Sequence, residues 1–296
     1  MMLAAGIVCL SIWVYLLAAH GHFWRISKFI PQASTFPEFH GRVAVIIPAR
    51  DEADVVGQAV ASLLGQKQVR ELHLFLVDDS STDGTAEIAR RAADEAGRSG
   101  ALTIIHGQPL PAGWSGKLWA VKQGIDAALA GNPDFLLLTD ADIVHGAESV
   151  AALASIAEKG GYDLVSFMAK LFCRSFAERM LIPAFVYFFF QLYPPAWIRD
   201  RRKATAGAAG GCILIRPEAL ARAGGIAAIR GEIIDDCALA RRVKRSGGRV
   251  WLGTTPAMQS IRPYRSFAEI GRMISRSAFN QLRHSTLLLL LAIVGM

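Results

Sequence analysis

The sequence has few cysteines, no internal repeats and no low-complexity tract, and each absence narrows the classes of protein to which it can belong. Its cysteines, Cys9, Cys173, Cys212 and Cys237, show neither metal-binding nor redox spacing. The absence of such spacing agrees with a reducing compartment and with a protein that has no disulfide framework. The formal net charge is +7, but no nucleic-acid-binding motif accompanies that charge. Nucleic acid is therefore not a predicted partner.

Charged residues are also absent from residues 1–24, a run that is long enough to cross the hydrocarbon core of a bilayer. No basic segment precedes this run, which favours a membrane anchor over a cleaved signal peptide. Arg25, Lys28 and Arg42 follow it, and the positive-inside rule places the downstream chain in the cytoplasm. We predict a transmembrane anchor over residues 1–24 and a linker over residues 25–41.

Two further segments combine apolar and basic residues in a way that favours contact with an anionic membrane surface. Residues 176–198 are rich in aromatic side chains but contain Pro183, so we predict a helix that lies in the membrane interface. A buried core helix is the alternative. Residues 266–296 predict an amphipathic helix followed by the start of a C-terminal transmembrane segment, or else by a tail packed on the domain.

Short runs of Val, Ile, Leu and Phe bounded by turn residues predict buried strands of a parallel sheet. These runs occupy 43–47, 72–77, 102–106, 135–138, 164–167 and 212–215. Apolar residues at helical spacing predict helices that follow the first three strands. The repeat of strand, helix and strand is that of a βαβ unit. We predict an α/β fold with a doubly wound, mainly parallel sheet, a nucleotide-binding half at 42–142 and a second half at 143–265.

Two acidic motifs follow strands of this predicted sheet, VDDSSTDGT (Val77–Thr85) and the Asp-x-Asp pair Asp140 and Asp142. In open α/β sheets, ligands bind outside the carboxyl ends of the strands. Carboxylates one residue apart can share a Mg²⁺ or Mn²⁺ ion that also binds substrate phosphates. Helix capping is the structural alternative. In the first motif, Thr85 is a predicted N-cap, and Asp79 is a candidate acceptor for an N–H group of a base.

Three other segments place charged groups at predicted helix starts or strand ends. Pro48–Glu52 closes the first strand with a cation and carboxylates. Lys117 ends Gly-Trp-Ser-Gly-Lys before a helix, where phosphates bind, although the spacing is not that of a P-loop and a solvated lysine is the alternative. Asp235 and Asp236 suit either a general base whose pKa is raised by its neighbour, or the dipole of a helix N-terminus.

Together these motifs resemble the inverting family 2 glycosyltransferases with the GT-A fold, over residues 43 to about 262. The resemblance rests on IIPARDE, VDDSSTDGT, GWSGK, the Asp-x-Asp pair and IDDCALARRV. Within that family the predicted anchor and the motifs GWSGKLWA, GAAGGCILI and RPYRSF are most similar to the hopene-associated glycosyltransferases of bacterial hopanoid clusters.

The resemblance implies a role for each candidate residue on the donor side. It implies that Asp79 faces the base, that Asp142 binds the metal and that Asp140 contacts the ribose, the diphosphate or the same metal. The further residues that it implies around the nucleotide-sugar are Pro48, Ala49, Arg50, Glu52 and Lys117.

On the acceptor side, Asp236 aligns with the last Asp of the family's Thr-Glu-Asp motif, which implies that it deprotonates the acceptor. Asp235 could share or take that role. Gln259 and Arg262 are similar to the Gln-x-x-Arg-Trp motif of processive members and are implied to lie near the acceptor. Pro263 replaces the Trp of that motif, which favours a single transfer.

The resemblance thus implies a bacterial inner-membrane enzyme whose glycosyltransferase domain, residues 42–265, lies in the cytoplasm. It would move a sugar from a nucleotide-sugar, a UDP-sugar in the first place, to a lipid acceptor in hopanoid biosynthesis, with Mg²⁺ or Mn²⁺ as cofactor. Another lipid, ceramide-like or a polyprenyl phosphate, is an alternative acceptor. A metal-dependent nucleotidyltransferase and a non-enzymatic scaffold are the competing functions.

Overall fold

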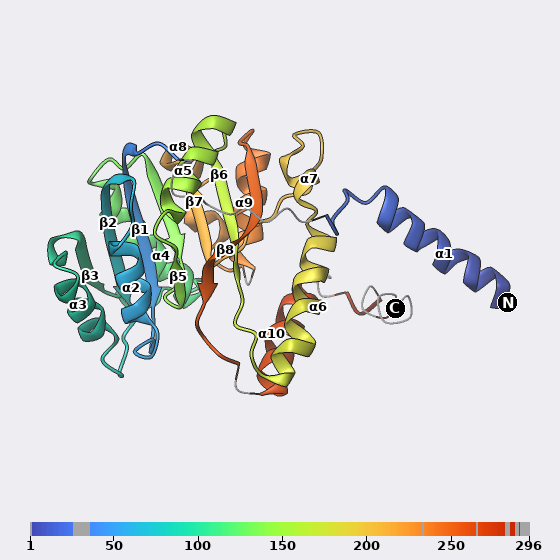
Figure 1. Cartoon of the computed structure of the whole chain (residues 1–296), viewed down its shortest axis with the longest axis horizontal. Helices are drawn as coiled ribbons and strands as arrows, with labels where there is room; N and C mark the ends of the chain where they lie inside the picture. The colour runs from blue at the N-terminus through green and yellow to red at the C-terminus, as the bar shows by residue number, and fades with distance from the viewer. Residues whose placement is uncertain are drawn as a thin grey trace. The chain divides into compact units, whose positions relative to one another are not determined.

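The computed structural model describes residues 2–25, 36–232, 234–264, 266–281, 285–287 and 290. The chain divides into two compact units (Figure 1). One, here called the sheet unit, comprises Ser27–Phe172 and Ala206–Arg262. The other, the helical unit, comprises Met1–Ile26, Cys173–Thr205 and Pro263–Met296.

The sheet unit contains a single eight-stranded sheet in the order β3-β2-β1-β4-β7-β6-β8-β5. Strands β1 to β4, β6 and β8 run in one direction, whereas β7 and β5 are antiparallel to their neighbours. The predicted α/β class with a mainly parallel sheet is confirmed. The strands are β1 (Phe39–Ala49), β2 (Val69–Asp78), β3 (Leu102–His106), β4 (Phe135–Thr139), β5 (Ile143–His145), β6 (Leu164–Lys170), β7 (Cys212–Ile215) and β8 (Val250–Ser260).

Helices cover both faces of this sheet. Buried side chains of α2, α3 and α5 join one core cluster with Val45, Ile47 and Leu74 of the sheet. Helix α4 packs on the opposite face, where a Cβ added at its Gly124 would lie 2.6 Å from Ile46 Cγ2. The helices of this unit are α2 (Val56–Leu64), α3 (Thr85–Glu95), η1 (Ser99–Ala101), α4 (Gly116–Leu129), α5 (Ser149–Gly160), α8 (Pro217–Arg222), η2 (Ile226–Ile229) and α9 (Asp235–Arg245).

Coverage on both faces explains why the predicted strands could be recognised. Strand β4 is buried at every position, and the centre of β1, Val43–Ile47, is buried as well. A strand that is buried on both faces has a continuous apolar run in its sequence. All six predicted strands are present. The structure adds β5, which has only three residues, and β8, in which polar residues interrupt the apolar run.

The helical unit contains α1 (Met2–Ala18), α6 (Phe176–Leu192), α7 (Pro195–Arg199) and α10 (Phe267–Gln281). A capping box begins α6, in which Ser175 Oγ accepts from the Glu178 N–H. Glu178 Oε2 accepts from the Ser175 N–H, and Glu178 Oε1 accepts from the Tyr264 N–H at 2.8 Å. At the other end, His20 Nε2 lies 2.7 Å from the Gln191 carbonyl oxygen and thus ties the end of α1 to α6.

Helix α6 continues through Pro183 and, counted together with α7, forms the 24-residue stretch Phe176–Arg199. By length and composition this stretch could cross a membrane, and the helix in the membrane interface stays a prediction. Helix α1 has 17 residues, fewer than the ~20 that a span needs. The anchor over 1–24 stays a prediction. Most of the predicted C-terminal segment, and residues 26–35 of the predicted linker, lie outside the described residues.

Candidate functional site

The carboxyl ends of β1, β2 and β4 meet at one edge of the sheet. The register pairs Ala49 with Asp78 and, on the antiparallel neighbour, Thr139 with Cys212. Strand β7 therefore begins where β4 ends, and the Gly210–Gly211 loop before it lies at the same edge. The acidic motifs after β2 and β4 are thus placed beside this loop, as ligand sites of α/β sheets require.

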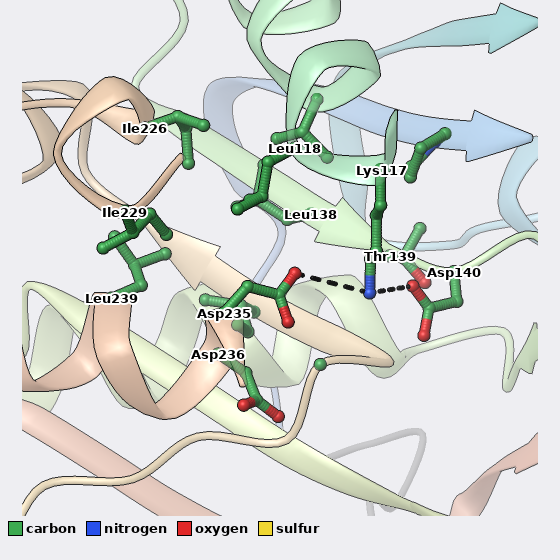
Figure 2. A pocket seen from close by; sticks show the side chains of 14 residues that line it. Lys117, Leu118, Leu138, Thr139, Asp140, Ile226, Ile229, Asp235, Asp236 and Leu239 are labelled. Carbon is green, nitrogen blue, oxygen red and sulfur yellow. Dashed lines mark ion pairs between the residues drawn. The ribbon is translucent and has the colours of Figure 1, made fainter. Parts of the chain in front are cut away.

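Lys117 connects two of the candidate carboxylates (Figure 2). Its Nζ lies 2.8 Å from Asp140 Oδ1 and 3.6 Å from Asp235 Oδ2, although the side chain is 42% exposed. Ser115 caps the preceding turn by accepting from the Leu118 N–H, which places Lys117 in the first turn of α4. Burial disfavours the charge, but Asp140 and Asp235 outweigh it and raise the pKa of Lys117. The lysine is therefore a fixed cation between two acids.

Asp236 lies next to this pair in the first turn of α9, and its Oδ1 accepts from the Cys237 N–H at 2.6 Å. Gly210 is close enough that an added Cβ would lie 3.4 Å from Asp236 Oδ2. Burial and the charge of Asp235 raise the pKa of Asp236 to about 6, against the opposing effects of N–H donors and Lys117. A carboxylate with this pKa is ionised at neutral pH and can accept a proton.

These groups line one pocket with a charged side and an apolar side. The pocket is partly open, so that the roughly 370 Å³ of empty space beside these residues includes open solvent. Lys117, Asp140, Asp235 and Asp236 form the charged side in Figure 2. The apolar side is formed by Leu118, Val121, Leu138, Ile213, Ile226, Ile229 and Leu239. Apolar walls strengthen the electrostatic interactions of charges beside them, which agrees with the raised pKa of Asp236.

Asp79 forms a second charged group at the same edge. Its Oδ2 lies 3.5 Å from Arg50 Nη1, and its N–H donates to the Ala49 carbonyl oxygen at 2.8 Å. A Cβ added at Gly116 would lie 3.1 Å from Asp79 Oδ2, so glycine allows this close approach. The side chain of Ala49 is 3% exposed, whereas Pro48 lines the pocket.

The other acids of the first motif hold the loops in shape. Asp78 Oδ1 accepts from the Ser81 N–H at 3.0 Å, and Asp83 accepts from both the N–H and the hydroxyl of Thr85. Thr85 was predicted to be the N-cap of α3, but Gly84 occupies that position with a φ of 85°. The Thr85 hydroxyl instead accepts from the Glu52 N–H at 2.8 Å.

Glu52, Asp142 and Arg262 form a third group. Arg262 Nη2 forms an ion pair with Glu52, and its Nε lies 3.9 Å from Asp142 Oδ2. Ser260 Oγ donates to Asp142 Oδ2 at 2.6 Å. Burial raises the pKa of Glu52, and Arg262 opposes that change. Arg262 thus lies with acids of the predicted donor side, whereas Gln259 is an exposed residue of β8 that pairs with Val144.

Sequence reasoning did not identify Ser260, Thr139 or Gly210 as site residues. The Ser260 hydroxyl donates to Asp142, and the Thr139 hydroxyl donates to the Gly211 carbonyl oxygen. Gly210 lies against Asp236. The GAAGG run before β7 was a usable signal for a close backbone approach. No comparable signal marked Ser260, because β8 itself was not predicted.

Asp140 and Asp142 fit a divalent cation by the chemistry of their oxygens. No group of three or more His, Cys, Asp or Glu side chains in the described part of the chain could hold a metal. Mg²⁺, however, usually takes one or two carboxylates and completes its octahedron with water and substrate phosphates. Two carboxylates at an open sheet edge therefore suit Mg²⁺ or Mn²⁺ that is bound together with a diphosphate.

Known proteins share both the sequence pattern and the fold. Residues 40–280 match the family model described as "Glycosyltransferase like family 2". The succinoglycan biosynthesis protein ExoU of Rhizobium meliloti is 43% identical over 56 residues, which are 19% of this chain and 16% of that relative. The chain thus spans a small part of this curated relative.

Two solved glycosyltransferase structures share the fold. The mannosyltransferase PcManGT from Pyrobaculum calidifontis, in complex with GDP-Man and Mn²⁺, has a TM-score of 0.60 at 20% identity over 90% of this chain and 70% of its own. S. aureus TarS in complex with UDP-GlcNAc has a TM-score of 0.52 at 16% identity over 81% of this chain and 67% of its own. The sheet is therefore of the GT-A type.

Proposed function

Because the chain belongs to glycosyltransferase-like family 2, we propose that it is an inverting glycosyltransferase that moves a sugar from a nucleotide-sugar to the hydroxyl group of a lipid. The observation that carries this proposal is the pocket in which Asp236, with a pKa of about 6, lies beside the Lys117–Asp140 pair. In this proposal Asp236 is the general base, and the Lys117–Asp140 pair is the charged group for the diphosphate beside it.

The donor side is formed by the groups at the ends of β1, β2 and β4. We assign Asp79 to the base of the nucleotide, with Arg50 as its counter-charge and Pro48 at the pocket wall. The binding of GDP-Man and Mn²⁺ by PcManGT, and of UDP-GlcNAc by TarS, supports a nucleotide-sugar donor, with a UDP-sugar as the first choice. Glu52 and Arg262 complete the donor side.

Asp140 and Asp142 would hold Mg²⁺ or Mn²⁺, and the ion would neutralise charge that develops on the diphosphate. Lys117 keeps one oxygen of Asp140 in place and adds a positive charge beside the same phosphates. Ser260 fixes the orientation of Asp142 through its hydroxyl group.

The acceptor hydroxyl gives its proton to Asp236, whose carboxylate is ionised above about pH 6. The acceptor oxygen forms a bond to the anomeric carbon from the face opposite the diphosphate, and the carbon–oxygen bond to the diphosphate breaks. The products are the glycoside with inverted configuration and a nucleoside diphosphate. Asp235 remains paired with Lys117, which favours Asp236 as the base of the two.

The acceptor that we propose is the hydroxyl of a hopanoid lipid at the cytoplasmic face of the bacterial inner membrane. The apolar stretch Phe176–Arg199 of the helical unit supports a membrane-bound enzyme, with Phe176, Met180 and Leu192 exposed on it. Hopanoid is chosen over a ceramide-like lipid or a polyprenyl phosphate because of the resemblance of the GWSGKLWA, GAAGGCILI and RPYRSF segments.

A donor panel tests the proposal directly. The protein is incubated with native bacterial membrane lipids, Mn²⁺ and each nucleotide-sugar in turn, and glycolipid products are identified by mass. We expect one lipid product and release of a nucleoside diphosphate, with loss of both in Asp236→Asn and retention of both in Asp126→Asn. Release of pyrophosphate would instead identify a nucleotidyltransferase, and absence of binding to any nucleotide-sugar would favour a scaffold.

A further inference from the structure

Thr139, the last residue of β4, carries a hydroxyl group that joins separate parts of the sheet unit. Its side chain is 2% exposed. The hydroxyl donates to the Gly211 carbonyl oxygen at 2.8 Å and lies 2.9 Å from His145 Nε2. A hydroxyl has only one hydrogen to donate, so Nε2 of His145 must donate the second hydrogen bond.

This arrangement fixes the tautomer of His145. Burial lowers the pKa of the imidazole to about 3, so the ring is neutral and carries its hydrogen on Nε2. The Nδ1 atom is then an acceptor, and it is buried without a partner in the part of the chain that the structure describes. A buried polar atom without a partner lowers stability, which an apolar side chain would avoid.

The hydrogen bond from Thr139 to the Gly211 carbonyl oxygen fixes a loop that contacts Asp236, the proposed base. Gly211 follows Gly210, whose N–H donates to the Asp236 carboxylate and where an added Cβ would lie 3.4 Å from Asp236 Oδ2. Ser166 of β6 also holds this loop: its Oγ donates to the Cys212 carbonyl oxygen at 2.9 Å and accepts from the Ala209 N–H. A shift of the Gly211 carbonyl group would therefore move the backbone that contacts the base.

The hydrogen bond between Thr139 and His145 connects Thr139 to β5, the strand that directly follows the Asp-x-Asp segment. His145 lies in β5 opposite Met258 of β8, and Ile143 lies opposite Ser260. Ser260 in turn donates to Asp142 Oδ2 at 2.6 Å. Thr139 itself directly precedes Asp140. The same hydroxyl is therefore hydrogen-bonded to the His145 side chain of β5, the strand that follows the proposed metal ligands, and to the Gly211 carbonyl oxygen in the loop that contacts the proposed base.

We propose that Thr139 is a positioning residue that sets the distance and orientation between the Asp140–Asp142 segment and the Gly210–Gly211 loop beside Asp236, with His145 as its fixed donor. This inference rests on the proposed function, because it concerns the alignment of donor and acceptor in one transfer reaction. A small misalignment of reacting groups can cost about 100-fold in rate.

The test compares Thr139→Val with Thr139→Ser. Valine keeps the shape but removes both hydrogen bonds, whereas serine keeps the hydroxyl. We expect Thr139→Val to lower kcat about 100-fold, while the KM for the best donor of the panel and the affinity for Mn²⁺ with UDP stay within about threefold. Thr139→Ser is expected to restore most of kcat. Far-UV circular dichroism and thermal unfolding show whether each variant is folded.

Each outcome bears on the inference. If Thr139→Val folds and turns over like the wild type, or if both variants lose kcat equally, Thr139 is not a positioning residue. If Thr139→Val does not fold, His145→Phe, which removes the Nε2 donor and the buried Nδ1 atom, must lower kcat with donor KM unchanged. Wild-type protein that transfers no sugar would overturn the proposed function and this inference together, whereas an active wild type with an active Thr139→Val overturns the inference alone.

Discussion

The replacement of Asp236 by Asn is predicted to remove transfer activity and, at the same time, to stabilise the protein at neutral pH. Asn has the size of Asp but carries no charge. Transfer should fall by a factor of about 100 to 10,000, the usual contribution of a general base. The stability effect has the opposite sign because the ionised form of Asp236 is disfavoured by burial and by Asp235.

The magnitude follows from the pKa. Asp236 rises from an ordinary value of 3.8 to about 6, and each pKa unit corresponds to about 1.4 kcal/mol. The upper limit for the gain in unfolding free energy is therefore about 3 kcal/mol at pH 7. Partial exposure of the side chain and opening of the pocket to solvent reduce this figure, so we expect about 1–3 kcal/mol.

The pH dependence of the stability difference shows whether the ionisation of Asp236 causes it. Below pH 3.8 the wild-type group is protonated in both the folded and the unfolded chain, so Asp and Asn should be nearly equal in stability. Above that pH the unfolded chain ionises first, and the wild type loses stability relative to Asp236→Asn until the folded group ionises at about pH 6. The difference should then stay constant.

Urea unfolding of both proteins between pH 4 and pH 8, without donor or metal, measures this difference. Asp83→Asn is the matched control, because hydrogen bonds from Thr85 and Ala53 lower the pKa of Asp83 and predict the opposite sign. An Asp236→Asn protein that is less stable than the wild type by the same amount at every pH would refute the raised pKa. It would also remove the main electrostatic argument for Asp236 as the base.

Three further predictions concern the rest of the site and the helical unit. Lys117→Met should move the acidic limb of the kcat/KM profile to higher pH, because the charge of Lys117 lowers the pKa of Asp236. Lys122→Met, which removes the ion-pair partner of the exposed Asp126, should leave the limb in place. Ser260→Ala should lower the affinity for Mn²⁺ in the presence of UDP about tenfold, measured by electron paramagnetic resonance; Ser246→Ala is the control, and an unchanged affinity would argue against Asp142 as a ligand. Phe188→Glu, at a position that is 45% exposed on α6, should weaken sedimentation with vesicles that contain anionic lipid, whereas Leu110→Glu, at a position that is 55% exposed in the sheet unit, should not. Equal effects of these two substitutions would contradict a membrane role for α6.

Most of the sheet could be predicted from local sequence because its central strands are buried on both faces. Residues 135–138 and 43–47 are continuous apolar runs for that reason, and each run is followed closely by a motif with charged residues. Strand β8 could not be found in this way. It mixes buried and exposed positions and contains Gly253 and Pro256, so its extended conformation depends on pairing with β6 and β5.

The sequence alone was therefore enough to predict candidate residues for the chemistry, because acids that follow buried strands lie where α/β sheets bind their ligands. Only the tertiary structure decided how those residues pair. Arg262 meets Glu52 across 210 positions of sequence, and Lys117 of α4 reaches Asp140 after β4 and Asp235 of α9.

Asp235 and Asp236 show why the pairing of these residues depends on the tertiary structure. The two residues are adjacent in sequence and equal in chemistry, so no local pattern separates them. Their positions in the first turn of α9 direct Asp235 to Lys117 and Asp236 to the Gly210 backbone. Side-chain direction in a helix, together with the packing of a loop from another part of the chain, sets the different electrostatic surroundings of two identical groups.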